Sequence, residues 1–216
     1  MPLSTTEIKN QKIVIIDTGC ANISSVKFAV ERLGVKVIVS DDPSVILRAD
    51  KVFLPGVGSA SSAMNNINQK LLVDTIQQIT NPVLGICLGM QLMTKFSHEV
   101  PGSHIADSET KNVDCLDLIP TEITRMDAGE LVLPHMGWNQ IKVEKNNPLF
   151  EGIEDGSYFY FVHSFCAPMS DYTLASCEYG QPFSAAIHNK NFYGVQFHPE
   201  RSGEAGSTLL QNFIEM

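Results

Sequence analysis

Four short apolar runs recur in the first 90 residues, and they constrain the fold more than any other feature of this chain. They cover residues 12–16, 35–39, 51–54 and 83–86 and are rich in valine and isoleucine. Runs of this length without polar alternation are typical of strands buried on both faces. Because helix-forming sequence separates them, the sequence predicts an α/β fold with a doubly wound, mostly parallel sheet and helices on both faces.

The intervals between these runs carry helix signals. Asn22 and Ser24 are candidate caps of a helix that continues to about Leu33 and ends at Gly34. Further helical segments are expected over residues 43–49, 59–79 and 88–96, the second of these following the loop sequence PGVG.

The second half of the chain has a different sequence pattern. Between residues 116 and 197 the segments are short, β-rich and separated by turns, and they include LVL, NQIKV and YFYFV. This pattern predicts antiparallel or mixed strands added to the same sheet. An amphipathic helix is expected after Gly203. No linker or repeat interrupts the pattern, so we expect one domain over 12–216, preceded by a polar extension over 1–11.

Composition excludes several classes of function. The net charge of −9 argues against nucleic-acid binding, and the apolar runs are too short to cross a membrane. The N-terminal sequence lacks the apolar core of a secretory signal. The five cysteines are odd in number and form no CxxC pair, which favours reduced thiols and a cytoplasmic protein. No metal or cofactor is expected.

One cysteine stands where the fourth predicted strand gives way to a helix. Cys87 lies between Gly85 and Gly89 in the sequence GICLG. A nucleophile on a sharp strand-to-helix turn needs flanking glycines, because neighbouring backbone approaches closely there. The helix start also favours thiolate and supplies N–H groups for an oxyanion. By itself the motif is equally consistent with a buried, inert cysteine.

A candidate base and its orienting group follow a later strand. His198 ends the sequence GVQFH, and Glu200 comes two residues after it. Imidazole is the usual base for a thiol nucleophile, and a carboxylate fixes its tautomer. Alone, His-Pro-Glu is more typical of a surface turn. Together with Cys87 it favours a nucleophile, a base and a carboxylate brought together by the fold.

With both motifs placed, the chain resembles the class I (triad) glutamine amidotransferases over residues 12–216. The resemblance implies that Cys87 attacks the side-chain amide of L-glutamine, that His198 transfers protons and that Glu200 orients His198. It also implies an oxyanion hole that uses the sequence LPGVGSA and the residue after the nucleophile. Its members would be Gly56, Val57, Gly58 and Leu88.

The same resemblance implies four contacts for the substrate. Gln91 and Glu99 would hold the polar groups of glutamine, one and three turns after Cys87, with Glu99 beyond the expected end of the helix. Ser164 and Phe165 match the segment that binds the backbone of glutamine. The family usually has tyrosine where this chain has Phe165, so a hydroxyl contact is lost there.

Within the family, three stretches resemble the glutaminase subunits of imidazole glycerol phosphate synthase. They cover residues 15–26, 133–139 and 158–165. This likeness implies a separate (β/α)8-barrel cyclase partner that receives ammonia and makes imidazole glycerol phosphate and aminoimidazole carboxamide ribonucleotide. The partner interface would include Pro134, His135, Met136, Gly137, Trp138 and Asn139. The chain departs from the family at 113–122, where a glycine-rich stretch is common.

Three other interpretations remain open from the residues. A cysteine hydrolase or peptidase could use a similar turn, although the His-Pro-Glu sequence and the PGVG loop disfavour it. A catalytically inactive glutaminase could regulate a partner, although Cys87, His198 and Glu200 are intact. The small subunits of anthranilate or aminodeoxychorismate synthase are the nearest rivals, and only the sequences HMGWN and DTGCAN separate them.

Overall fold

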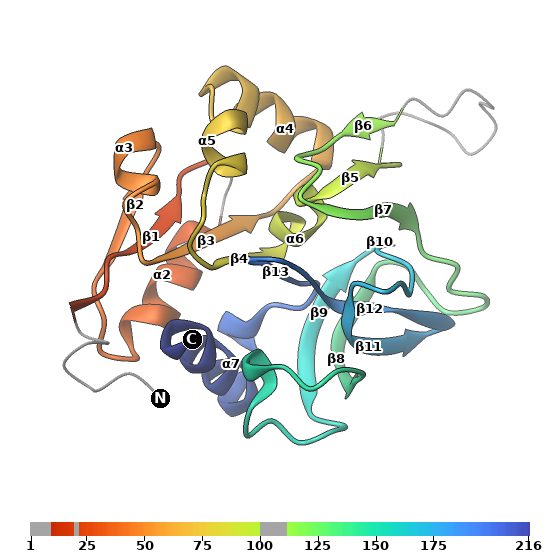
Figure 1. Ribbon diagram of the computed structural model, residues 1–216. Helices are drawn as coiled ribbons and strands as arrows, with labels where there is room; N and C mark the ends of the chain where they lie inside the picture. The colour runs from red at the N-terminus through yellow and green to blue at the C-terminus, as the bar shows by residue number, and fades with distance from the viewer. Residues whose placement is uncertain (1–9, 20–21, 100–111) are drawn as a thin grey trace.

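A computed structural model describes residues 10–19, 22–99 and 112–216 (Figure 1). The expectations for the first nine residues and for the polar stretch 100–111 lie outside these ranges. The described part is built on a nine-stranded sheet that runs through the whole molecule. Its order is β2 (Val37–Ser40), β1 (Ile13–Ile16), β3 (Lys51–Gly56), β4 (Val83–Cys87), β13 (Phe192–Val195), β12 (Gln181–Asn189), β11 (Thr173–Tyr179), β8 (His135–Val143) and β9 (Tyr158–His163).

The relative direction of neighbouring strands changes once across the sheet. It is parallel from β2 to β13 and antiparallel from β13 to β9. The α/β class and the added antiparallel strands are therefore confirmed. Because β13 lies parallel beside β4, both strands end at the same edge, with Val195 opposite Ile86. Parallel neighbours place their following loops together, which is how residues far apart in the sequence reach one site.

Helices cover the parallel part of the sheet on both faces. In Figure 1, α2 (Ile23–Glu31) and α7 (Gly203–Glu215) lie below it, while α3 (Pro43–Ile46), α4 (Ala60–Gln69) and α5 (Val73–Gln77) lie above it. β1 shows the consequence for burial. Ile13 and Ile15 belong to the apolar core between the sheet and the helices α2 and α7, whereas Val14 and Ile16 belong to the core on the opposite face of the sheet. Alternate residues of a strand point to opposite faces, so this run must be apolar throughout.

A second, smaller sheet was not expected from the sequence. It has the order β10 (Phe165–Cys166), β7 (Ile119–Arg125), β5 (Thr94–Ser97) and β6 (Val113–Asp114). The helix expected over residues 88–96 ends early, as α6 (Leu88–Leu92), and β5 takes over its second half. β5 pairs in parallel with β7, and this long-range pairing overrides local helix propensity.

Other local expectations were also wrong. The helical stretch over 59–79 is interrupted at Leu71, whose φ of 55° ends α4 before α5 begins. The sequence LVL at 131–133 is not a strand. Asn22 precedes α2, but its side chain makes no cap hydrogen bond. Its amide is used elsewhere, as described below.

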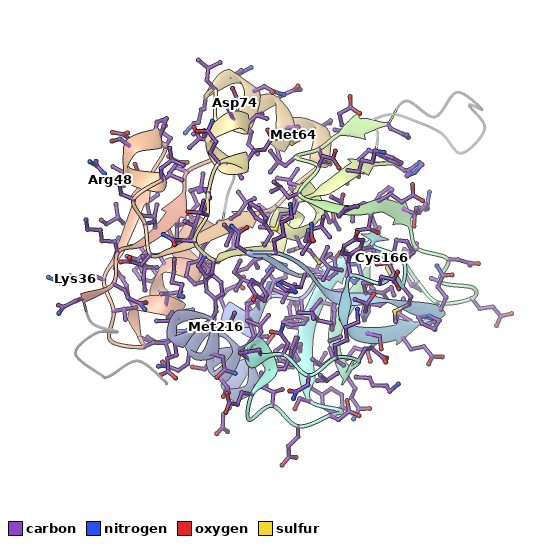
Figure 2. The ribbon with its side chains drawn as sticks, in the orientation of Figure 1. Lys36, Arg48, Met64, Asp74, Cys166 and Met216 are labelled. Atoms are coloured by element: carbon purple, nitrogen blue, oxygen red, sulfur yellow. The ribbon has the colours of Figure 1, made fainter. Side chains whose placement is uncertain are left out.

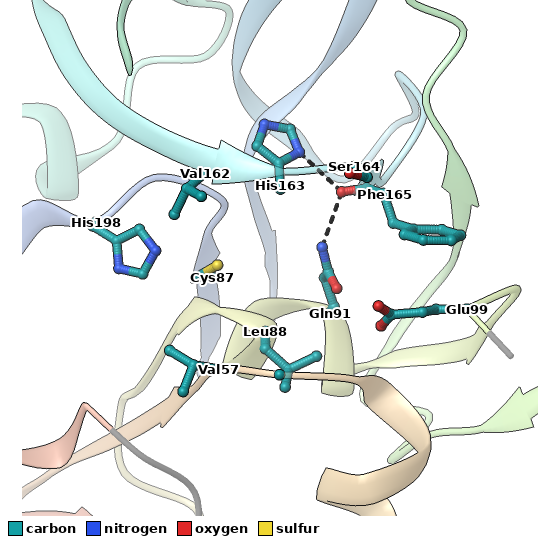
Figure 3. A pocket seen from close by; sticks show the side chains of 11 residues that line it. Val57, Cys87, Leu88, Gln91, Glu99, Val162, His163, Ser164, Phe165 and His198 are labelled. Atoms are coloured by element: carbon teal, nitrogen blue, oxygen red, sulfur yellow. Dashed lines mark hydrogen bonds between the residues drawn. The ribbon is translucent and has the colours of Figure 1, made fainter. Parts of the chain in front are cut away.

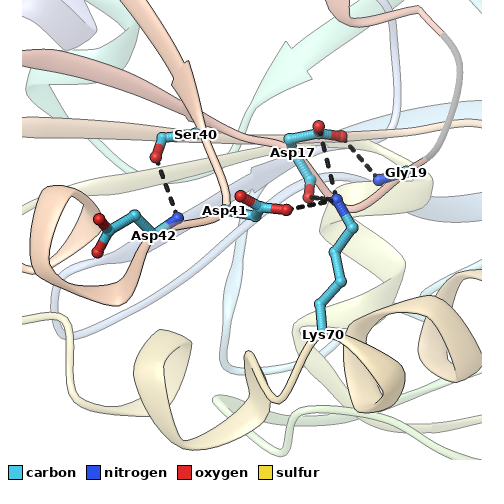
Figure 4. A network of polar contacts seen from close by, with 6 residues as sticks. All are labelled: Asp17, Gly19, Ser40, Asp41, Asp42 and Lys70. Carbon is cyan, nitrogen blue, oxygen red and sulfur yellow. Dashed lines mark hydrogen bonds and ion pairs between the residues drawn. The ribbon is translucent and has the colours of Figure 1, made fainter.

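Polar contacts and packing fix the strand ends. Figure 4 shows Lys70, just after α4, donating to the backbone oxygen of Asp17 and to the carboxylate of Asp41, both at 2.9 Å. The ends of β1 and β2 are thus tied to α4.

Charged side chains such as Lys36 and Arg48 extend from the periphery, whereas Cys166 is buried (Figure 2). Two short 3₁₀ helices, η1 (Pro148–Phe150) and η2 (Pro199–Arg201), complete the described elements.

Candidate active site

Cys87 occupies a strained turn between β4 and α6. Its φ of 54° and ψ of −112° lie outside the regions that side chains other than glycine usually adopt. The flanking glycines make the turn possible. A Cβ at Gly89 would lie 1.7 Å from the backbone oxygen of Leu54, and one at Gly85 would lie 2.8 Å from the backbone of Gly89. The steric reason expected from the sequence therefore holds in the structure.

The end of β3 runs beside this turn. Gly56 is the register partner of Cys87, and a Cβ there would approach the Gly89 nitrogen to 3.0 Å. Pro55 and Gly56 belong to the strand rather than to a loop, and only the residues after them leave the sheet. Val57 and Gly58 then line the same pocket as Leu88. The proposed oxyanion-hole residues therefore lie around the sulfur of Cys87.

His198 and Glu200 lie together beyond the end of β13. The Nδ1 atom of His198 is 2.8 Å from Oε1 of Glu200, and the two side chains are 4% and 0% exposed. Since a carboxylate oxygen accepts here, Nδ1 carries the proton and Nε2 is left to act on a reacting group. Nε2 has no hydrogen-bond partner among the described residues. Figure 3 shows the ring of His198 beside the sulfur of Cys87.

The charge state of His198 follows from these neighbours. Burial of the ring lowers its pKa, but the Cys87 sulfur and the Glu200 carboxylate outweigh burial and raise the pKa to about 10. By contrast, burial raises the pKa of Cys115, Cys166 and Cys177 to about 12. Those three thiols are poor nucleophiles at neutral pH, while Cys87 lies next to a stabilised imidazolium.

Two buried glutamines organise the floor of the site. The Nε2 group of Gln91 donates to the backbone oxygen of Phe165 at 3.0 Å and to Oε1 of Gln196 at 2.9 Å. The Nε2 of Gln196 lies 3.8 Å from the Cys87 sulfur. Both N–H groups of the Gln91 amide are thereby used, so its Oε1 is the atom that remains for a ligand.

The pocket itself has a volume of about 240 Å³. This is smaller than the cavities that hold drug-sized ligands and suits a molecule of amino-acid size. Besides residues already described, its wall contains Glu99, Val162, His163, Ser164 and Phe165 (Figure 3). The four substrate residues expected from the sequence therefore share one pocket with Cys87 and His198.

Glu99 reaches this pocket by a different route from the one expected. It does not lie on the helix after Cys87 but follows β5, and its Oε2 accepts the backbone N–H of Ala60 at 2.9 Å. Burial raises the pKa of the Glu99 carboxyl, and the Ala60 hydrogen bond opposes this in part. A half-buried carboxylate at this wall can receive an ammonium group.

The sequence did not point to three residues of the site. Asn22 donates from Nδ2 to Oε1 of Glu200 at 2.8 Å, and Gln196 and His163 contact the site as described. The sequence held weak signals for each. Asn22 lies in the stretch DTGCAN, Gln196 lies two residues before His198, and His163 directly precedes Ser164.

The stretch expected at a partner interface separates into two sets. Met136 and Trp138 are 63% and 54% exposed, which suits an interface. His135 is 3% exposed, so the expectation that it meets a partner is corrected: its side chain points inward and contacts His163. Strand alternation causes the division, because successive residues of β8 face opposite sides.

Two further features of the described residues bear on the expected class. Within them, no group of three or more His, Cys, Asp or Glu side chains is arranged to hold a metal ion. None of their helices is both long and apolar enough to span a membrane.

A nucleophile elbow with a paired histidine and carboxylate, at the carboxyl edge of a mixed sheet, defines the site of a triad amidotransferase. The model of the family "Glutamine amidotransferase class-I" matches residues 14–216, and the chain belongs to this family. The relatives are more specific. The chain is 56% identical over 206 residues to imidazole glycerol phosphate synthase subunit HisH of Vibrio parahaemolyticus, covering 95% of this chain and 98% of that protein.

Other relatives agree. The chain is 57% identical to the subunit of the same name in Vibrio cholerae, covering 95% of this chain and 99% of that protein. A solved structure of a GMP synthase subunit from Thermoplasma acidophilum has a TM-score of 0.69 at 17% identity, covering 95% of this chain and 93% of that one. At that identity it shows the fold alone. The resemblance drawn from the sequence, to the family and to these glutaminase subunits, is confirmed.

Proposed function

We propose that this chain is the glutamine amidotransferase subunit of an imidazole glycerol phosphate synthase and acts in histidine biosynthesis. It hydrolyses L-glutamine to glutamate and ammonia and supplies the ammonia to a cyclase subunit. The observation that carries the proposal is the strained Cys87 beside His198, whose Nδ1 is paired at 2.8 Å with the buried carboxylate of Glu200. Identities of 56% and 57% to the HisH subunits support the synthase assignment.

The chemistry follows from the proton positions. The raised pKa of His198 keeps on Nε2 the proton taken from the thiol of Cys87, and the thiolate attacks the side-chain carbonyl carbon of glutamine. The oxyanion that forms lies near the backbone N–H of Leu88 and the Val57–Gly58 backbone, where fixed donors stabilise it. The imidazolium then protonates the departing nitrogen, and ammonia leaves a glutamyl thioester on Cys87.

Water completes the cycle. His198, neutral again, takes a proton from water, and the hydroxide attacks the thioester carbon. The collapse of the second tetrahedral species releases glutamate and returns the proton to Cys87. Throughout, Glu200 accepts from Nδ1 of His198 and favours its charged form. Asn22 holds Glu200 in place through Oε1.

Substrate positioning uses the remaining wall of the pocket. Oε1 of Gln91 is the acceptor left for a ligand in this pocket, and the carboxylate of Glu99 is the negative group that suits the α-ammonium of glutamine. Ser164 and Phe165 lie along the side of the pocket and would contact the backbone of glutamine. Phe165 provides no hydroxyl for that contact.

The partner surface adjoins the pocket. Met136 is the register partner of Val162, which lines the pocket, and Trp138 is the register partner of Tyr160. With Tyr158, which is 54% exposed, Met136 and Trp138 form an apolar patch next to the site where ammonia is released. Exposed aromatic and methionine side chains are enriched at interfaces. We place the (β/α)8-barrel cyclase on this patch.

A matched pair of cysteine variants tests the catalytic assignment. The chain is purified with the cyclase subunit of a relative, and glutamate formation is measured in the presence of the cyclase substrate. Cys87→Ala should abolish glutamate formation, whereas Cys177→Ala, which also changes a buried thiol, should retain it. Retained turnover in the Cys87→Ala complex would refute the mechanism.

The nature of the partner distinguishes this function from its nearest rivals. The small subunits of anthranilate and aminodeoxychorismate synthase share the elbow chemistry but serve other partners. A barrel subunit of roughly 250 residues that copurifies with this chain would support the proposal. Glutaminase stimulation by a chorismate-using subunit, and none by the cyclase, would contradict it.

A further inference from the structure

A line of polar contacts connects strand β8 with the wall of the pocket. Nδ2 of Asn139 lies 3.2 Å from Nε2 of His135, and Nδ1 of His135 lies 3.0 Å from Nε2 of His163. Nδ1 of His163 then lies 2.9 Å from the backbone oxygen of Phe165. The histidines are 3% and 6% exposed, so water competes little with these contacts.

The direction of every hydrogen bond in this line is determined. A carbonyl oxygen only accepts, so Nδ1 of His163 must donate to Phe165. Burial lowers the pKa of His163 to about 3 and that of His135 to about 4, so both rings are neutral. Nε2 of His163 is therefore an acceptor, and Nδ1 of His135 donates to it. Nε2 of His135 in turn accepts from Asn139.

The far end of the line is fixed independently. Nδ2 of Asn139 also donates to the backbone oxygen of Glu178 at 2.9 Å, and Oδ1 accepts the backbone N–H of Gln140 at 2.8 Å. These two contacts determine the orientation of the Asn139 amide without reference to the histidines. We call this line of three hydrogen bonds, from Asn139 through His135 and His163 to Phe165, the relay. In each of its bonds the donor is the group nearer Asn139 and the acceptor is the group nearer the pocket.

Ring stacking holds His135 in place. Its ring stacks on Phe161 and on Tyr179 at centroid distances of 4.9 and 4.1 Å, with 22° between the planes in both cases. Tyr179 is itself held, because its hydroxyl donates to the backbone oxygen of Val132. A stacked ring cannot turn away from His163, so the relay moves with β8.

At the pocket, the relay acts on one carbonyl group. The backbone oxygen of Phe165 accepts from both His163 and Gln91, which fills its two acceptor positions. This oxygen is thus not left for the substrate. It instead sets the orientation of the Phe165–Cys166 peptide group, directly after Ser164 and Phe165 in the pocket wall.

We propose that His135 and His163 are positioning residues for glutamine: their hydrogen-bond relay sets the Ser164–Phe165 segment from β8, the strand that also carries the exposed side chain of Trp138. Glutamine affinity is thereby tied to the partner-facing strand. Neither histidine takes part in proton transfer. This inference rests on the proposed function, since it concerns glutamine binding at the same site.

Two substitutions of His135 separate the relay from bulk packing. His135→Phe keeps an aromatic ring between Phe161 and Tyr179 but removes the donor to His163. His135→Asn loses the stacked ring but keeps a donor at the δ position. In the complex with the cyclase subunit, His135→Phe should raise KM for glutamine about 5- to 10-fold, with kcat changed less than about 2-fold. His135→Asn should bring KM back toward the wild-type value.

Two measurements accompany the kinetics. Inactivation of Cys87 by iodoacetamide should proceed at the wild-type rate in His135→Phe, because the relay does not touch the nucleophile. His188→Phe is the matched control, since His188 also stacks on a tyrosine, Tyr193, and also uses a ring nitrogen, on the backbone oxygen of Lys190. It should leave KM unchanged.

Nitrogen NMR of the wild-type protein tests the relay without any substitution. Imidazole ¹⁵N shifts should identify both His135 and His163 as neutral rings with the proton on Nδ1. An Nε2–H tautomer for either ring would overturn the relay. So would a wild-type KM in His135→Phe, or equal impairment of the Phe and Asn variants. A wild-type complex that forms no glutamate would instead overturn the proposed function, and this inference with it.

Discussion

A methyl group on Gly89 would collide with the backbone of strand β3. The added Cβ would lie 1.7 Å from the backbone oxygen of Leu54, where contacts below 3.0 Å are essentially never found. Relief requires a shift of at least about 1.3 Å between α6 and β3. Leu54 is paired in the sheet with Gly85, so β3 cannot retreat without breaking the ladder beside Cys87.

Three glycine-to-alanine variants should lose unfolding free energy in the order of their steric overlap. For Gly89→Ala we expect a loss of about 4 kcal/mol or more in unfolding free energy, beyond the roughly 1–3 kcal/mol of ordinary overpacking. Gly85→Ala, with a closest backbone approach of 2.8 Å, should cost about 2 kcal/mol. Gly34→Ala is the control, because its Cβ meets nothing within 4 Å and only its φ of 86° is unfavourable, at about 1 kcal/mol.

Urea unfolding followed by circular dichroism measures this order, and glutamate formation measures the effect on the elbow. Displacing the nucleophile by about 1 Å should reduce turnover about 100-fold in any Gly89→Ala protein that folds. Gly34→Ala should retain full activity. If Gly89→Ala unfolds at the same urea concentration as Gly34→Ala and remains active, the steric account of this turn is wrong.

Three further predictions concern the surroundings of the elbow. Asn22→Ala removes a donor to the buried carboxylate of Glu200 and should lower kcat/KM for glutamine about 10- to 100-fold, as steady-state kinetics would show; an unchanged value would contradict the positioning role. The neutral rings of His135 and His163 make the fold acid-sensitive, because the unfolded chain binds protons that the folded one rejects. The unfolding free energy should therefore fall as the pH drops below about 6.5, down to about pH 4 for His135 and about pH 3 for His163. His135 alone accounts for about 3 kcal/mol of this loss, so the slope of urea stability against pH should be smaller in His135→Phe than in the wild type. Trp138→Ala, at an exposed position, should leave the melting temperature within about 2 °C but weaken binding to the cyclase by about 10-fold or more in calorimetry, and wild-type affinity would argue against the proposed interface.

The sequence was most informative where chemistry and local backbone geometry coincide. Cys87 was identified because a strand-to-helix turn needs its glycines, and His198 because it follows a strand that reads as buried. Their meeting also followed from the parallel pattern, since the carboxyl ends of neighbouring strands share an edge. Glu200 was placed by its two-residue offset from His198.

The sequence was least informative where contacts join residues that are far apart in the chain. Asn22 read as a helix cap, because asparagine before a helix usually caps it, yet its amide bonds Glu200, 178 positions away. His135 was expected at the partner interface because the resemblance placed residues 134–139 there. The strand register turned it inward instead. Glu99 was expected beyond the end of a helix over 88–96, because no local signal announces that β5 replaces the second half of that helix.

By itself, the sequence determined the four parallel strands of its first 87 residues, the doubly wound sheet they build and the pairing of a cysteine with a distant histidine. These features depend on periodicity and turn chemistry, which are local properties of the chain. Only the tertiary structure decided which polar side chains satisfy one another around Cys87. Hydrogen bonds such as those from Asn22 to Glu200 and from His135 to His163 depend on distances of about 3 Å between separate elements, and no local pattern encodes such distances.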